Sequence, residues 1–220
     1  MTEREHNAPR IIGNRYQVIN RLGAGSLGTV YKVKDRLTGH IVALKIVTEL
    51  SGDDLGGSHG NTQTVRIALA REFKTLASLR HPNIINVLDY GFDLNEAKQA
   101  RQPYYTMDYL HGAKPLTKAG SDQPLSLQID LLIQLLYALS YLYRRGILHR
   151  DLKPANVLVV MDDDQHPIVK VLDFSLAAIL NSHKRLDETG DDVAAGTLAY
   201  MAPEVLQGTD VGPAADLHAV

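Results

Sequence analysis

Three glycines interrupt the most regular alternating stretch of the chain, and this interruption constrains the fold more than any other feature. Residues 16–22 alternate in character, Gly23-Ala-Gly25-Ser-Leu-Gly28 breaks the pattern, and the alternation resumes at Val30. Alternating residues predict half-buried β-strands, and glycines between two such runs predict a turn between paired strands. Ile41–Val47 continues the pattern, so the segment predicts a three-stranded antiparallel meander.

The glycine-rich turn has two explanations. Small residues let backbone N–H groups approach phosphate oxygens closely, which would suit a nucleotide. A plain hairpin turn is the commoner reason for such glycines. Because the turn joins two predicted strands, and not a strand to a helix, the sequence disfavours a dinucleotide-binding fold.

Composition excludes several classes of protein. The 220 residues suit one large domain or two small lobes, and 45% of them are hydrophobic, as in a globular protein with a core. A net charge of −2 argues against binding nucleic acid by bulk electrostatics, and the absence of cysteine excludes disulfides and cysteine-ligated metals. Residues 1–14 are a polar leader without the apolar core of a signal peptide. We therefore expect a cytoplasmic protein.

Periodicity predicts further elements in the first half of the chain. After a flexible loop at 49–64, apolar residues on one face predict a helix over Ile67–Leu79, which Pro82 ends. Two more strands are predicted at Ile84–Tyr90 and Tyr104–Tyr109, joined by a polar connection from Asp93 to Gln102.

The second half is predicted to be richer in helix. Lys114–Pro124 is loop-like, and a helix follows whose apolar residues recur at three- and four-residue steps, namely Leu132, Leu135, Leu136, Leu139 and Leu142. Polar residues interrupt the stretch from Leu125 to Leu148, so it predicts a buried amphipathic helix, ended by Gly146, and no membrane segment. A hairpin over 156–172 and a helical turn at 204–207 follow, and the two halves meet near Asp108–Lys114.

A lysine and a glutamate suggest an ion pair in the first half. Lys45 lies within an apolar predicted strand, where its charge needs a partner or carries a desolvation cost of several kcal/mol. Phosphate oxygens and a carboxylate would serve, and Glu72 on the following helix is the candidate carboxylate. Taken singly, each residue is better explained without a site, Lys45 as an edge lysine that reaches solvent and Glu72 as a solvated helix glutamate.

The segment His149-Arg-Asp-Leu-Lys-Pro-Ala-Asn156 carries the most specific chemistry. Asp151 can accept the proton of a hydroxyl, Lys153 can steady a moving phosphoryl group, and Asn156 can hold a metal. Asp173 follows an apolar run and would add a second oxygen ligand for Mg²⁺, although by itself it is better explained as a simple strand-ending aspartate. An ordinary polar loop does not explain the order of residue types from 149 to 156.

In this order and spacing the motifs resemble the protein kinase superfamily, over roughly Tyr16 to the last residue. The resemblance implies an α+β, bilobal protein-kinase-like fold, with an antiparallel β-sheet N-lobe carrying one main helix and a mainly helical C-lobe. The kinase domain would cover 15–220, with the N-lobe at about 15–108 and an incomplete C-lobe, lacking its last helices, at about 109–220. Asp216 matches the buried aspartate that holds the catalytic-loop backbone.

The resemblance also assigns roles to individual residues. Asp151 would be the catalytic base, assisted by Lys153, Lys45, Glu72 and Thr197, while Asn156 and Asp173 would hold Mg²⁺. Lys45 would orient the phosphates of ATP, and backbone atoms of Asp108 and Leu110 would bind its adenine. The full ATP-binding set is Leu22, Gly23, Ala24, Gly25, Ser26, Leu27, Gly28, Thr29, Val30, Ala43, Lys45, Met107, Asp108, Leu110 and Leu158.

Lys153 and Thr197 are similar to residues of serine/threonine kinases, so we expect Ser or Thr hydroxyls of a protein substrate as acceptors. Arg150 resembles the arginine that receives an activation-loop phosphate, and Thr189 or Ser182 would carry that phosphate. The resemblance also implies autophosphorylation as one possible reaction. One signature departs from the family, because Ser175 follows Asp173-Phe174 where glycine is usual. The alternatives are a pseudokinase or ATP-binding scaffold, inactive through truncation, and a small-molecule phosphotransferase of the same fold.

Overall fold

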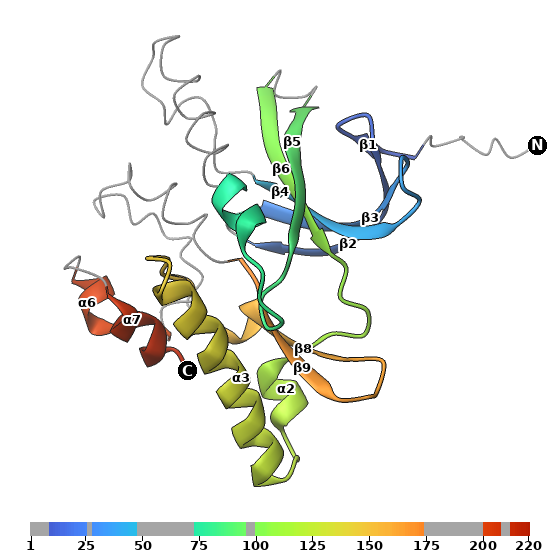
Figure 1. Ribbon diagram of the computed structural model, residues 1–220. Coiled ribbons are helices and arrows are strands. Elements are labelled where there is room, and N and C mark those ends of the chain that lie inside the picture. Colours follow the sequence, from blue (N-terminus) through green and yellow to red (C-terminus); the bar gives the residue numbers. More distant parts are fainter. Residues whose placement is uncertain (1–8, 26–27, 48–72, 96–99, 174–199, 208–211) are drawn as a thin grey trace, which may run out of the picture. The chain divides into compact units, whose positions relative to one another are not determined.

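The structure of the protein is a computed structural model that describes residues 9–25, 28–47, 73–95, 100–173, 200–207 and 212–220 (Figure 1). Contacts divide the chain into two compact units. The first unit comprises residues 1–62 and 87–109, and the second comprises residues 63–86 and 110–220. Each unit has its own sheet.

The first unit contains a six-stranded sheet with the strand order β1-β2-β3-β4-β6-β5. All its described pairings are antiparallel. The strands are β1 (Ile11–Ile12), β2 (Tyr16–Gly25), β3 (Gly28–Asp35), β4 (Ile41–Val47), β5 (Val87–Asn95) and β6 (Ala100–Asp108). The predicted meander over residues 16–47 is therefore confirmed by β2, β3 and β4.

The predicted polar connection between β5 and β6 is wrong. Asp93 pairs with Gln102 and Asn95 with Ala100, so the two strands continue through residues that we expected to form a loop. Leu94 near the end of β5 is 57% exposed, so an apolar residue here is not directed into the core and the alternation of a half-buried strand is lost. The predicted strand at Ile84–Tyr90 also begins too early, since β5 starts at Val87.

The core of the first unit lies on one face of the sheet. It consists of Ile12, Tyr16, Val33, Val42, Leu44, Ile46 and Tyr104, each at most 7% exposed. The rings of Tyr16 and Tyr104 meet edge to face with their centroids 5.8 Å apart, a favourable geometry for aromatic pairs. Burial of this apolar face is the main source of stability for the sheet.

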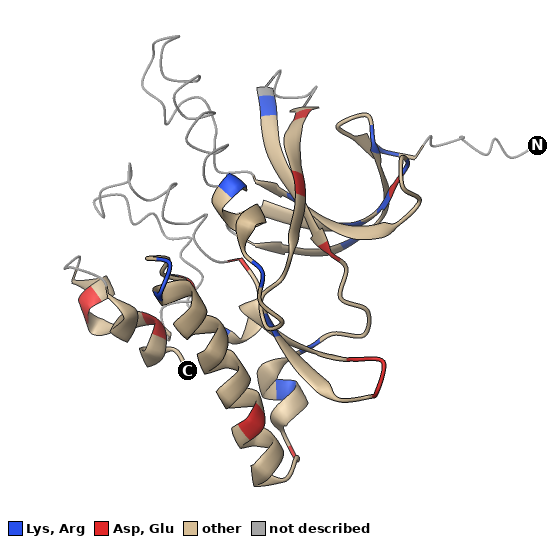
Figure 2. Ribbon diagram, viewed as in Figure 1, with Lys and Arg blue, Asp and Glu red and all other residues tan. Residues whose placement is uncertain are grey.

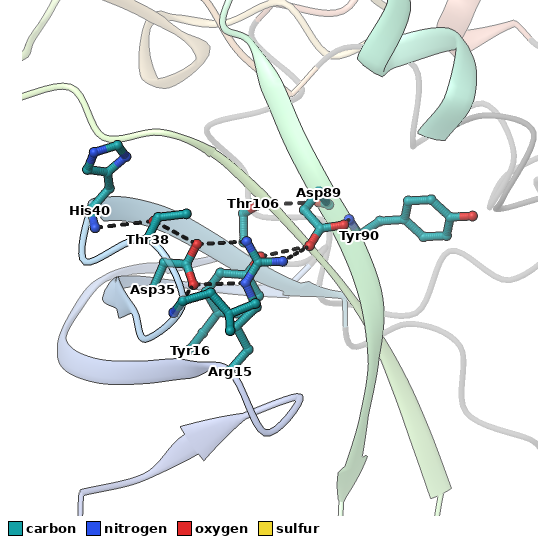
Figure 3. A network of polar contacts seen from close by, with 9 residues as sticks. Arg15, Tyr16, Asp35, Thr38, His40, Asp89, Tyr90 and Thr106 are labelled. Atoms are coloured by element: carbon teal, nitrogen blue, oxygen red, sulfur yellow. Dashed lines mark hydrogen bonds and ion pairs between the residues drawn. The ribbon is translucent and has the colours of Figure 1, made fainter.

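A polar network centred on Arg15 ties the turn before β2 to three strands (Figure 3). The guanidinium donates to both carboxylate oxygens of Asp35, at 2.8 and 2.7 Å, and to Asp89 at 2.8 Å. Asp89 also accepts a hydrogen bond from the Tyr16 hydroxyl at 2.8 Å. The Arg15 guanidinium holds the pKa of Asp35 well below its usual range, and burial raises the pKa of Tyr16.

We expect Arg15→Ala to destabilise the protein by about 2 kcal/mol at pH 7, because Asp35 would remain buried without its cation. The folded pKa of Asp35 lies below the unfolded value of about 3.9. Its ionised form therefore contributes stability above about pH 4, and this contribution is lost as the pH falls through the folded pKa.

The variant should accordingly show a shallower loss of stability below about pH 4 than the wild type, in urea unfolding curves recorded between pH 7 and pH 3. Arg21→Ala is the matched control, because Arg21 is an exposed arginine of β2. Identical acid limbs for Arg15→Ala and the wild type would contradict the assignment.

The second unit combines a three-stranded antiparallel sheet, of strand order β7-β8-β9, with helices. Its elements are β7 (Lys114–Pro115), α2 (Leu116–Gly120), α3 (Leu125–Tyr143), the 3₁₀ turn η1 (Pro154–Asn156), β8 (Val157–Met161), β9 (Pro167–Val171), α6 (Pro203–Leu206) and α7 (Pro213–His218). The hairpin and the helical turn are confirmed. The predicted loop at 114–124 is wrong, since it contains β7 and α2.

The predicted apolar stripe of helix α3 is confirmed in part, at Leu135, Leu139 and Leu142. Leu131, Leu135, Ala138, Leu139 and Leu142 are buried, whereas Leu132 and Leu136 are 39% and 43% exposed. Asp130 is the one charged residue between Leu125 and Tyr143, so the helix is almost free of charge colours in Figure 2. In the described part of the chain, α3 is the one helix that is long and apolar enough to cross a membrane, judged by its length and composition alone. Its Gln134 nevertheless accepts a hydrogen bond from Val169 N of β9 at 2.9 Å, which ties the helix to the sheet.

The segment after the predicted first helix packs with the second unit. Residues 73–78 are helical, and Asn83 then donates from its side chain to Gln134 at 2.9 Å and to Val169 O at 3.1 Å. The backbone of Asn83 accepts from Val171 N at 2.9 Å, and Ile85 N donates to Val171 O at 3.0 Å. Residues 83–85 therefore lie along β9, within the second unit.

Candidate active site

The predicted site residues are divided between the two units. The first unit holds Leu22, Gly23, Ala24, Gly25, Gly28, Thr29, Val30, Ala43, Lys45, Met107 and Asp108, and the second holds Leu110, Asp151, Lys153, Asn156, Leu158 and Asp173. Ser26, Leu27, Glu72 and Thr197 lie outside the described residues, as do Ser175, Ser182 and Thr189.

Strand register gathers part of the first set on one face of the sheet. Val30 is paired with Lys45, and Ala43 is paired with both Lys32 and Met107. Directly paired residues of antiparallel strands point to the same side, so these five side chains share a face, here called the Lys45 face. The apolar core lies on the opposite face, because Val33, Val42 and Leu44 alternate with these residues.

The glycine-rich turn joins β2 and β3 as predicted, with Gly25 paired to Gly28. Gly28 has φ 143°, and a Cβ there would collide with the carbonyl oxygen of Ile46 in β4. Its glycine is therefore required by the sheet itself. At Gly23 and Gly25 a Cβ would meet no described atom within 4 Å. Packing among the described residues thus does not account for the first two glycines.

Lys45 is buried in the middle of β4, with only 6% of its surface exposed. It pairs with Val30 on one side and Tyr105 of β6 on the other. The sheet thereby holds an ammonium group on the Lys45 face, in the apolar strand where the sequence placed it. Such burial is uncommon for a lysine and favours a specific anionic partner.

A buried carboxylate organises the loop that precedes η1. Asp216 of α7 is 3% exposed, and its two oxygens accept hydrogen bonds from His149 N at 2.7 Å and Arg150 N at 2.8 Å. Arg150 has φ 65°, a left-handed conformation that is costly for a residue with a Cβ. Asp216 therefore fixes the strained backbone immediately before Asp151.

His149 fixes the same loop from its other side. Its ring is fully buried, with Nε2 2.9 Å from Leu172 O, and Asp151 N donates to Nδ1 at 3.4 Å. Burial lowers the pKa of His149, which favours the neutral ring that these partners require. With Nδ1 accepting, Nε2 carries the proton and donates to Leu172. The imidazole thus joins the loop to the residue that follows β9.

Asp151 has two polar neighbours in this loop. Lys153 Nζ lies 3.0 and 2.8 Å from its two carboxylate oxygens, and Asn156 Nδ2 donates to its Oδ2 at 3.1 Å. Asn156 Nδ2 also donates to the Asp151 carbonyl at 2.7 Å. Because the amide nitrogen faces Asp151, the amide oxygen of Asn156 remains the end of the side chain that can ligate a metal.

The second predicted metal ligand, Asp173, directly follows a residue that is hydrogen-bonded to the first ligand, Asn156. Leu172 N donates to Asn156 O at 2.9 Å, so the residue after β9 is joined to η1, and Asp173 follows with φ 57°. Amide and carboxylate oxygens suit Mg²⁺, which commonly takes one or two protein ligands together with phosphate and water. Within the described ranges, no cluster of three His, Cys, Asp or Glu residues could hold a metal ion. The amide oxygen of Asn156 and the carboxylate of Asp173 are donors that would suit a Mg²⁺ shared with phosphate and water.

The sequence did not reveal the role of Tyr143 at the end of α3. Its hydroxyl lies 3.5 Å from Pro213 O, and burial, together with the Asp216 carboxylate, raises its pKa. Tyr143 thus lies beside Asp216, the aspartate that anchors the loop. A tyrosine six residues before His149 carries no signal for such a contact, which arises only when α7 packs against α3.

Comparison with known proteins agrees with this architecture. The protein kinase domain family matches residues 16–220. The kinase domain of PknI from Mycobacterium tuberculosis, solved as a double mutant, is 27% identical with a TM-score of 0.60, over 96% of this chain and 72% of that one. An antiparallel sheet unit, a helix-containing unit and an anchored loop carrying Asp, Lys and Asn define a protein-kinase-like fold. This chain belongs to the protein kinase domain family.

Two curated relatives resemble the chain over most of its length. The DNA damage-responsive serine/threonine-protein kinase RqkA of Deinococcus radiodurans is 34% identical over 96% of this chain. Serine/threonine-protein kinase A of a Synechocystis species is 29% identical, also over 96% of this chain. The match covers only 29% and 40% of these relatives, respectively. The chain thus spans well under half the length of either.

Proposed function

We propose that the protein transfers the γ-phosphoryl group of ATP to Ser or Thr hydroxyls of protein substrates. The observation that carries the proposal is Asp151, whose carboxylate is held by Lys153 and Asn156 on a loop anchored by Asp216. A fixed carboxylate of this kind can align an incoming hydroxyl and accept its proton. The names of the curated relatives, both serine/threonine-protein kinases, support the choice of acceptor.

The Lys45 face supplies the nucleotide side of the proposal. Val30, Ala43 and Met107 offer an apolar surface for adenine, while buried Lys45 supplies a cation for the phosphates. The open space at Gly23 and Gly25 lets the backbone of the turn approach phosphate oxygens. Asp108 and Leu110 provide the backbone groups for the adenine edge.

Asn156 and Asp173 are the proposed ligands of Mg²⁺, which neutralises phosphate charge when it is bound. Lys153 holds the Asp151 carboxylate in place and offers a positive charge beside the transferred group. We further propose that phosphorylation at Thr189 or Ser182 regulates the protein through Arg150. The cytoplasmic location, and the absence of a membrane segment, stay predictions from the sequence.

The proposal is tested by incubating the purified protein with γ-labelled ATP, Mg²⁺ and a mixture of unstructured Ser- and Thr-containing proteins. Labelled phosphoserine or phosphothreonine is expected, without phosphotyrosine, and chelation of the metal should stop the transfer. Binding of ATP without any transfer would favour an ATP-binding scaffold. Label found only in small molecules would favour a small-molecule phosphotransferase.

A further inference from the structure

Lys32 is a charged residue on the Lys45 face that the proposed mechanism does not use. It lies on β3, paired with Asn20 of β2 and with Ala43 of β4, and it is half-buried. Its Nζ is 4.4 Å from the centroid of the Tyr109 ring. An ammonium at this distance over a tyrosine face is a cation–π contact.

Tyr109 lies at the point where β6 ends. Asp108, paired with Val42, is the last residue of β6, and Tyr109 follows it directly. Since the strand order is β3-β4-β6, the contact reaches from β3 past β4 to the chain leaving the sheet. It therefore restrains Tyr109 between Asp108 and Leu110, the two residues whose backbone groups are proposed to bind adenine.

We propose that Lys32 and Tyr109 form a positioning pair that holds the backbone at 108–110 for the adenine of the nucleotide; this inference rests on the proposed function. The pair needs a cation on β3 and an aromatic face after β6. Lys32→Arg keeps the cation and Tyr109→Phe keeps the aromatic ring. Lys32→Met removes the cation but keeps a long side chain, and Tyr109→Leu removes the ring but keeps an apolar side chain.

We expect Lys32→Met and Tyr109→Leu each to weaken equilibrium binding of ADP and adenosine by about three- to tenfold, as for loss of a half-buried cation–π contact. Binding of inorganic tripolyphosphate, which lacks adenine, should not change. The KM for ATP should rise by a similar factor while kcat stays close to that of the wild type. Lys32→Arg and Tyr109→Phe should bind ADP and adenosine about as tightly as the wild type.

A double variant carrying both losses should bind ADP no more weakly than either single variant, because one contact can be lost only once. Lys34→Met is the matched control. Lys34 is an exposed lysine of the same strand and the same face, paired with Ile41, and its loss should change nothing. Melting temperatures of all variants show whether folding is intact.

Equal ADP binding by the wild type, Lys32→Met and Tyr109→Leu would overturn the pair while leaving the proposed function standing. Weaker binding in Lys32→Met alone would also overturn it, since the lysine would then contact the nucleotide directly. If the wild type bound neither ADP nor ATP, the proposed function would fail and the pair with it.

Discussion

Replacing Asp151 by asparagine should reduce phosphoryl transfer by roughly 10²- to 10⁴-fold, the usual contribution of a general base. Asparagine has nearly the same shape but cannot take up the proton of a hydroxyl at neutral pH. Its amide NH₂ would also face Lys153 Nζ or Asn156 Nδ2, both of which donate to the present carboxylate. The variant therefore loses both its basicity and one of its stabilising contacts.

The measurement is kcat/KM with labelled ATP, together with the dissociation constant for ADP. That constant should stay within about twofold of the wild type, because Asp151 is proposed to align the acceptor hydroxyl and not to bind the nucleotide. Asp164→Asn is the matched control, since Asp164 is an exposed aspartate in the turn between β8 and β9. Transfer by Asp151→Asn at the wild-type rate would remove Asp151 from the mechanism.

Replacing Asp216 by alanine should destabilise the protein by about 3–5 kcal/mol. The carboxylate is buried and accepts from His149 N and Arg150 N, so its loss leaves one buried and one partly buried donor without their acceptor, at about 1–3 kcal/mol each. This is a large part of the 5–15 kcal/mol by which a domain is usually stable. Asp216→Asn keeps one accepting oxygen and should lose less.

Urea unfolding gives the change in stability, and hydrogen exchange locates it. The amides of His149 and Arg150 should exchange much faster in Asp216→Ala, even under conditions in which the protein stays folded. Asp163→Ala is the control for loss of an exposed aspartate, with an expected change within about 0.5 kcal/mol. Unchanged protection of both amides would show that something else holds the loop.

The sequence predicted those parts of the molecule in which local pattern and tertiary role coincide. The meander over residues 16–47 follows from alternation, and its register then places Val30, Ala43 and Lys45 on one face. The motif at 149–156 predicted the loop that joins Asp151, Lys153 and Asn156. In both cases the residues that determine the local structure and those that carry the chemistry are close together in the sequence.

The predictions of secondary structure and of buried faces failed where tertiary packing, and not the local sequence pattern, determines the structure. The ends of β5 and β6, at 93–95 and 100–102, were missed because the sequence there is largely polar, and α2 was missed because it is a five-residue helix without a side-chain cap. The stripe of α3 was assigned from leucine spacing alone, although Ala138 belongs to it and Leu132 does not. The contact between Lys32 of β3 and Tyr109, which follows β6, joins residues far apart in the sequence, and no local pattern predicts it.

The pairing of residues 83–85 with β9 determines which segments we expect to unfold together. Asn83 and Ile85 share backbone hydrogen bonds with Val171, and Asp173 follows β9 after a single residue. Segments joined in this way tend to unfold as one cooperative unit. A fluctuation that frees the carboxylate of Asp173 by melting β9 would therefore also release the chain around Asn83. Residues 83–85 precede the predicted boundary near Asp108–Lys114, yet we expect them to unfold together with β9 of the second unit.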